Sequence, residues 1–151
     1  MINSHVALHP LHHPDPALHF IEQLIHQATE ENVSDIHFEP QAEQCRIRFR
    51  RQGLLYLANT ISLHFALQVT ASLKIMAQLD ITEKRLPQDG RIPLKLAGKD
   101  IDIRLSSVPT AFGERLVMRL QDRSNVILEL EQLGFSEELQ ATLGELLQKT
   151  Y

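Results

Sequence analysis

The sequence predicts an α+β domain in which a mainly antiparallel sheet packs against helices. In three segments, apolar residues recur at steps of three and four, as on one face of a helix. Between these segments apolar and polar residues alternate, and glycine-containing turns separate the alternating stretches, which is typical of hairpins and not of strand–helix–strand units. With 151 residues, 43% of them apolar and 23% charged, the chain can close one core.

Four of the eight histidines lie in residues 1–14, which show no apolar period, so we expect a flexible His-rich tail there. The histidines of this tail could in principle ligate a transition metal, but no carboxylate or cysteine stands at a fixed spacing beside them, and we assign no metal site. Asp15-Pro16 resembles a helix N-cap followed by a first-turn proline. A helix is therefore predicted from this point to about Asn32.

The alternation of polar and apolar residues predicts the first strands. Ser34–Pro40 alternates and ends at a proline, while Cys45–Arg50 places Ile47 and Phe49 on one side and arginines on the other. Gly53 permits a turn into Leu54–Leu57, so these segments form a plausible hairpin.

A second helix is predicted over Ser62–Leu79, with Ser62 as its cap. Pro87–Gly90 then has the composition of a tight turn, at which we expect the chain to reverse. Two strands, Ile92–Leu96 and Ile101–Leu105, follow around Gly98 as a second hairpin.

Arg115–Leu120 is a further alternating strand, and Ser136 is placed to cap a last helix that reaches about Lys149. Among the charged residues nearby, Asp100, Asp102 and Arg104 share one strand face, where we expect surface ion pairing.

Catalytic signatures are absent from the sequence. A phosphate-binding P-loop needs two glycines separated by four residues, followed by lysine and a hydroxyl residue, but the only Gly-Lys pair, Gly98-Lys99, precedes Asp100. The sequence also lacks hydrolase, zinc-peptidase and dinucleotide-binding motifs. Glu83, Asp89 and Glu114 are interpreted as surface or turn residues. We therefore expect this chain alone to have no catalytic residue and to bind no cofactor.

The cysteine count, the first residues and the length of apolar runs indicate the compartment in which the protein is found. Cys45 is the only cysteine, the opening residues do not resemble an export signal, and no apolar run is long enough to span a bilayer, so cytoplasmic residence is expected. A net charge of −4 disfavours nucleic acid, although Arg46, Arg48 and Arg50 form a small basic strand face.

Arginines bracket the stiff segment Glu83–Arg91. A guanidinium held by a rigid turn could bind phosphate through paired, charge-assisted hydrogen bonds, and the alternative is a surface ion pair.

Several motifs together resemble one family. Ser34–Pro40 is similar to a Ser-Asp-Ile-His-x-Glu-Pro segment, Leu73–Arg91 to its most recognisable block, and Asp102–Ser106 and Thr110–Leu120 to later strands, followed by Leu133-Gly134. This is the GspE/PilB/HofB family of hexameric ATPases of type II secretion and type IV pilus assembly. The resemblance covers about residues 15–133.

The resemblance implies a PAS-like regulatory domain at residues 15–133, with residues 134–151 as a terminal helix that leads toward a RecA-like motor domain. That motor domain, which binds ATP and Mg²⁺ in the family, lies outside this chain, so we expect an excised part or a truncated product of a longer ATPase. Arg91 and Arg104 are implied to contact the γ-phosphate, with Arg85 and Arg119 as further candidates.

The implied partners are the motor domain of the same or a neighbouring subunit and the inner-membrane secretion or pilus platform. The parent protein is implied to be a homo-hexamer held at the inner membrane by its partners, with no role for nucleic acid. The alternative is a PAS-like module that binds a protein or small ligand and has no nucleotide role.

Overall fold

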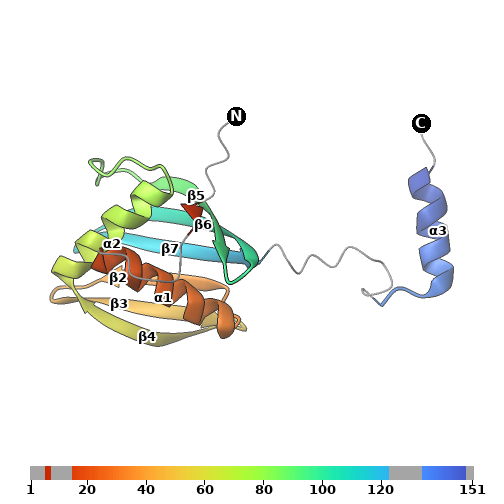
Figure 1. The fold of residues 1–151 in the computed structure, drawn as a ribbon, viewed down its shortest axis with the longest axis horizontal. Helices are drawn as coiled ribbons and strands as arrows, with labels where there is room; N and C mark the ends of the chain where they lie inside the picture. Colours follow the sequence, from red (N-terminus) through yellow and green to blue (C-terminus); the bar gives the residue numbers. More distant parts are fainter. Residues whose placement is uncertain (1–5, 8–14, 123–133, 149–151) are drawn as a thin grey trace.

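A computed structural model of the chain describes residues 6–7, 15–122 and 134–148. The described elements comprise three helices and seven strands (Figure 1). In chain order they are β1 (Val6–Ala7), α1 (Pro16–Glu30), β2 (Asp35–Pro40), β3 (Gln44–Arg51), β4 (Leu54–Ser62), α2 (Leu63–Met76), β5 (Gln88–Leu96), β6 (Lys99–Thr110), β7 (Gly113–Asp122) and α3 (Glu137–Gln148).

The strands form one sheet in the order β1-β5-β6-β7-β2-β3-β4. Every neighbouring pair from β5 to β4 is antiparallel, and only the two-residue β1 runs parallel to its neighbour β5. Helices α1 and α2 lie together across one face of this sheet (Figure 1). The predicted class, an α+β domain with a mainly antiparallel sheet packed against helices, is confirmed.

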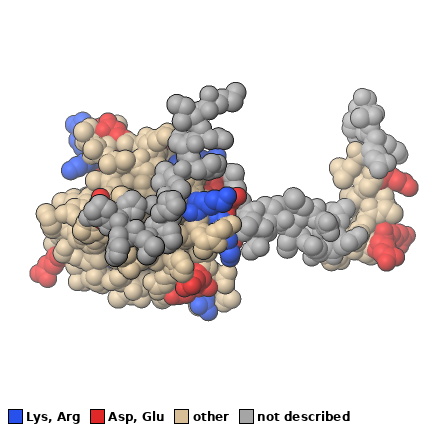
Figure 2. All heavy atoms as spheres, in the orientation of Figure 1, with Lys and Arg blue, Asp and Glu red and all other residues tan. Residues whose placement is uncertain are grey.

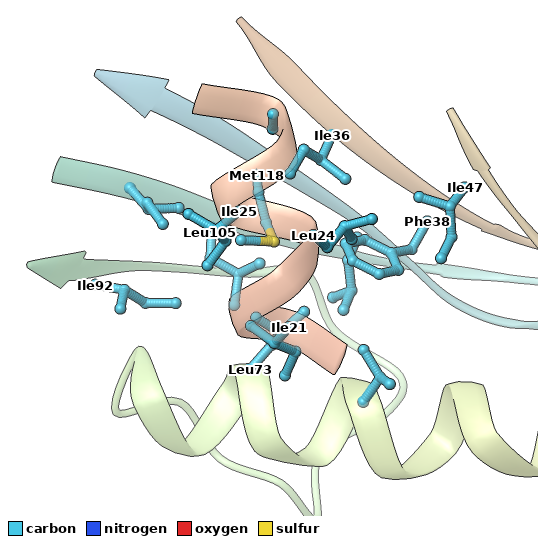
Figure 3. Close-up of a cluster of buried hydrophobic side chains, with 14 of the residues drawn as sticks. Ile21, Leu24, Ile25, Ile36, Phe38, Ile47, Leu73, Ile92, Leu105 and Met118 are labelled. Carbon is cyan, nitrogen blue, oxygen red and sulfur yellow. The ribbon is translucent and has the colours of Figure 1, made fainter. Parts of the chain in front are cut away.

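The core lies between these two helices and the sheet. Ile21 and Ile25 of α1 and Leu73 of α2 are buried against strand residues that include Ile36 and Met118 (Figure 3). The Asp15 carboxylate accepts a hydrogen bond from the Ala17 amide and begins α1 where the sequence predicted. Burial of this single apolar layer stabilises the packing of α1 and α2 on the sheet. Among the described residues, no helix covers the opposite face of the sheet (Figure 1).

Two predicted hairpins are confirmed, and both have two-residue turns with positive φ. Gln52 and Gly53 have φ of 50° and 82°, and Ala97 and Gly98 have φ of 48° and 79°. Positive φ at both central residues matches the twist of the flanking strands and makes a tight connection. The glycine in each pair adopts this conformation without a Cβ penalty.

The turn predicted at Pro87–Gly90 is wrong, because Gln88 through Gly90 already belong to β5. The chain reverses earlier, in residues 77–87. Gly90 has no positive φ; it is required because a Cβ there would lie 2.7 Å from the carbonyl oxygen of Ala77. The glycine therefore lets β5 approach the end of α2 closely.

Two terminal segments complete the description. Val6–Ala7 pairs with Leu94 and Lys95 in a region for which the sequence predicted no strand, and the rest of the predicted tail lies outside the described residues. Helix α3 begins after Ser136, as predicted, and stands apart from the sheet in Figure 1. Its Leu139, Leu146 and Leu147 are exposed. None of the helices in the described ranges is long and apolar enough to cross a membrane.

Candidate functional site

A row of charged residues crosses five neighbouring strands. Arg91 of β5 is paired with Arg104 of β6, which is paired with Arg119 of β7. Arg119 is paired in turn with Asp35 of β2, and Asp35 with Arg50 of β3. Because directly opposed residues of an antiparallel sheet point to the same side, these five side chains share one face. We call Arg91, Arg104 and Arg119 the arginine row.

This face is the one that the helices leave open. Ile92, Ile103 and Met118, which precede or follow the arginines by one residue, are fully buried under the helices, so the arginines point the other way. Figure 2, which views the molecule from the helix-covered side, shows charged side chains mainly at the edges of that side. The cationic row therefore lies on the face of the sheet opposite α1 and α2.

The two outer arginines of the row are tied to buried carboxylates, and the middle one is not. Arg91 donates to Asp102 on β6, and Arg119 donates through Nε to Asp35 over 3.0 Å. The side chains of Asp102 and Asp35 are only 5% and 7% exposed. The Arg104 side chain is exposed and makes no hydrogen bond or ion pair with the residues that the structure describes.

Like charges placed directly opposite one another destabilise a sheet, and Arg104 has an arginine on each side. Asp35 offsets part of this repulsion. Its burial alone would raise the pKa of the carboxyl, but hydrogen bonds from Ser34 and Arg119 and the charge of Arg119 outweigh burial and lower that pKa. Asp35 is thus an anion in the row, while the space around Arg104 remains suited to an added anion.

A shallow hollow of about 490 Å³ lies beside this middle position. It is lined by Asp89, Gly90, Arg104, Leu105, Ser106, Val117 and Arg119. The Ser106 hydroxyl hydrogen-bonds to the Asp89 carboxylate at its edge. The guanidiniums of Arg104 and Arg119 in this lining are groups that bind a phosphate, whereas the Ser106 hydrogen is already donated to Asp89.

Arg85, the fourth predicted phosphate contact, is not part of the row. It lies in the segment between α2 and β5, its side chain is 89% exposed, and its Nε lies 3.6 Å from an oxygen of Glu83. Three of the four predicted arginines thus share one face, and Arg85 lies in the loop outside their strand pairing.

The sequence analysis did not predict a buried polar cluster that connects α2 and β7 to the segment between α2 and β5. Lys74 of α2 is 1% exposed, and its Nζ donates to Glu114 Oε1 of β7 and to the carbonyl oxygen of Glu83, both over 2.7 Å. Ser107 also donates to Glu114, over 2.8 Å. The interpretation of Glu114 as a surface residue is wrong, since its side chain is 8% exposed. No sequence signal distinguished this lysine from a solvent-facing helical one.

Two arginines of β3, Arg48 and Arg50, have carboxylate partners, Glu39 and Asp35. Arg48 makes two parallel hydrogen bonds to Glu39, over 2.8 and 2.9 Å, and Arg115 donates to the same carboxylate over 3.0 Å. Burial raises the pKa of Glu39, and the bonds and charges of these arginines lower it by more. On the basic strand face considered for nucleic acid, Arg48 and Arg50 therefore have counter-ions, whereas no carboxylate among the described residues pairs with Arg46.

His37 is a second buried polar residue that the sequence did not predict. It is 7% exposed, and its two ring nitrogens have no hydrogen-bond partner among the described residues. Burial, followed by the charge of Arg115, lowers its pKa and favours the neutral ring. It borders the row through its strand partner Val117.

The alternative of a PAS-like module with a small ligand in an apolar pocket finds little space in the apolar cleft beside α2. An apolar cleft between α2 and the β6–β7 turn, which includes Phe38, Leu63, Leu67 and Phe112, has a volume of about 180 Å³. Small-molecule sites usually exceed about 300 Å³. The described ranges contain no group of three or more His, Cys, Asp or Glu side chains that could hold a metal ion. The predicted tail histidines lie outside these ranges.

Comparison with known proteins agrees with the resemblance. A family model described as "Type II/IV secretion system protein" matches residues 11–151. The chain is 47% identical over 138 residues to the type II secretion system protein HxcR of Pseudomonas aeruginosa, covering 90% of this chain and 29% of HxcR. It is 42% identical over 135 residues to the type IV pilus assembly ATPase PilB of Acinetobacter baylyi, covering 89% of this chain and 23% of PilB.

A solved structure shares the fold. The ATPase DotB of Yersinia pseudotuberculosis superposes with a TM-score of 0.52 at 17% identity, over 89% of this chain and 37% of DotB. The chain spans about a quarter of the length of the curated relatives it matches. With the family match extending from residue 11 to residue 151, the chain belongs to the type II/IV secretion system protein family.

Proposed function

We propose that this chain is the regulatory, nucleotide-contacting domain of an ATPase that powers type II secretion or type IV pilus assembly. The observation that carries the proposal is the arginine row on the face of the sheet opposite the helices. Relatives named as secretion proteins and as a pilus assembly ATPase extend well beyond the matched region. The ATP and Mg²⁺ are held by a RecA-like motor domain of the longer parent protein.

The row acts on the γ-phosphate of ATP bound to that motor domain, in the same or a neighbouring subunit. Arg104 is the leading contact, because it is exposed and has no carboxylate partner among the described residues. Arg91 and Arg119 flank it, and Arg85 lies outside the row. Guanidiniums that reach phosphate only when the domains close stabilise the transferring charge and couple hydrolysis to domain motion.

The parent assembles as a homo-hexamer on the cytoplasmic side of the inner membrane, where platform proteins of the secretion or pilus machinery hold it. In such a ring the motor domain covers the open face of the sheet, since that face carries the charge that a bound triphosphate neutralises. The helix-covered face and the exposed leucines of α3 remain for packing within the longer chain.

The test is ATP turnover by the full-length protein. Arg104→Ala is expected to lower kcat by about 1,000-fold or more, the range seen for arginines that reach a transferring phosphoryl group, and Arg91→Ala to lower it less. Arg51→Ala is the matched control, because Arg51 is an exposed arginine of β3 outside the row. Unchanged kcat in Arg91→Ala and Arg104→Ala, with the same assembly state, would show that the row has no role at the phosphate.

A further inference from the structure

We propose that Asp102 and Asp35 are positioning residues that hold the two outer arginines beside Arg104, so that three guanidiniums converge on one anion. This inference rests on the proposed function and adds two acidic residues to it. A carboxylate beside a phosphate site would ordinarily weaken anion binding. The geometry of each pair indicates that its net effect here is the reverse.

Asp102 precedes Arg104 by two residues on β6, so the two side chains share a face. Arg91, directly opposite Arg104, reaches diagonally along that face to Asp102 through Nη2. The carboxylate is 5% exposed and the arginine 56% exposed, so the fixed member of the pair is Asp102. The Nε of Arg91 is not used in this contact and stays available to a ligand.

Asp35 plays the corresponding part at the other end of the row. It lies directly opposite Arg119, is 7% exposed, and accepts from Arg119 Nε over 3.0 Å. Ser34 Oγ donates to its second oxygen over 2.8 Å, and Arg50 Nε lies 3.7 Å from that oxygen. Asp35 therefore cannot turn with the arginine. Arg119 is bound by Nε alone, and its two terminal nitrogens remain available.

The three arginines of the row have different roles: Arg91 and Arg119 are anchored, and Arg104 is not. Each outer arginine makes a one-point contact with a buried carboxylate, and neither contact uses the whole guanidinium fork. An exposed arginine without such an anchor loses several rotatable bonds of freedom when it binds a ligand, and this entropy opposes binding. Anchors that restrict Arg91 and Arg119 in advance lower that cost while Arg104 completes the site.

The direction in which one substitution changes anion affinity distinguishes positioning of the arginines from charge attraction alone. Asp102→Asn removes a negative charge next to the row, so attraction between charges alone predicts tighter binding of an anion. Positioning predicts weaker binding, because Arg91 loses its charged anchor. The change is nearly isosteric, and its effect on the fold can be measured independently.

The experiment titrates inorganic pyrophosphate into this chain and follows the arginine Nε–Hε signals by NMR. Asp102→Asn and Asp35→Asn are each expected to weaken binding about two- to fivefold, the size of an exposed charged contact, and to weaken the Nε–Hε signal of Arg91 or Arg119, because protons of a released guanidinium exchange faster with water. Asp100→Asn is the matched control on the same strand; Asp100 is 64% exposed, 3.9 Å from Lys95, and should leave the affinity unchanged or slightly higher. Equal or tighter pyrophosphate binding by Asp102→Asn would overturn the proposal.

Two further variants keep the result interpretable. Arg91→Lys and Arg119→Lys preserve charge but lose the planar fork, so they test positioning even if a buried Asp→Asn change unfolds the protein. Weaker binding by both is expected, and wild-type affinity in both would reject the positioning role. Arg104→Ala tests the proposed function instead. If it leaves pyrophosphate binding intact, the phosphate site itself is wrong, whereas a loss there with normal Asp102→Asn binding rejects only the role of the carboxylates.

Discussion

Replacement of Lys74 tests how the fold holds the segment that precedes the arginine row. Lys74 is the charged residue most deeply buried in the described core, and it connects α2 to Glu114 of β7 and to the backbone of Glu83. Lys74→Met keeps the length and apolar stem of the side chain while it removes the charge. The carboxylate of Glu114 is then left buried with only the Ser107 hydroxyl as a donor.

Loss of one partner of a buried ion pair destabilises a protein by about 3–5 kcal/mol, because the remaining charge stays out of water. We therefore expect Lys74→Met to lower the free energy of unfolding by about that amount, which corresponds to a Tm lower by roughly 6–20 °C for a chain of this size. The double variant Lys74→Met/Glu114→Gln removes both charges and should recover about 2 kcal/mol of the loss.

The assay is urea unfolding followed by circular dichroism, with the four proteins of the double-mutant cycle compared at equal m-value. A loss below about 1 kcal/mol in Lys74→Met, or a double variant less stable than the single one, would refute the buried ion pair. Lys95→Met is the control, since the side chain of Lys95 is 62% exposed and its nearest carboxylate oxygen is 3.9 Å away.

Three other predictions concern single positions. Gly90→Ala should cost about 1–3 kcal/mol in urea unfolding, because its Cβ would meet the Ala77 carbonyl oxygen, whereas Gly144→Ala, with open space at the Cβ, should cost nothing. Burial raises the pKa of Cys45 to about 11, so a thiol reagent at pH 8 should label native protein far more slowly than urea-unfolded protein. Asp35 has a pKa below its ordinary value of 3.8, so its stabilisation is present above about pH 4 and lost as the pH falls through the folded pKa; Asp35→Asn should flatten this loss in acid unfolding curves.

Local patterns in the sequence predicted most of the fold. The Asp15 and Ser62 caps, the two-residue turns at Gly53 and Gly98, and the alternation of the strands each depend on a few neighbouring residues. Local chemistry also produced the main error. The composition of Pro87–Gly90 suits a tight turn, but the long-range approach of β5 to Ala77 is what requires the glycine there.

The candidate site was predictable only in part. The resemblance named the arginines individually, but the register that brings Arg91, Arg104 and Arg119 into one row depends on the order of strands β5, β6 and β7 in the sheet. Their carboxylate partners depend on it as well. Asp35 lies 84 residues from Arg119 along the chain, a separation at which sequence pattern carries no pairing information.

In the proposed mechanism, the arginine row meets the phosphates of a nucleotide held by a motor domain. The most direct measurement is a cryo-electron microscopy structure of the full-length protein with Mg²⁺ and a non-hydrolysable ATP analogue. The account predicts a nitrogen of the Arg104 guanidinium within about 3 Å of a γ-phosphate oxygen in at least one subunit, with Arg91 or Arg119 beside it. A closed, nucleotide-loaded subunit interface in which the open face of the sheet is turned away from every phosphate would contradict it.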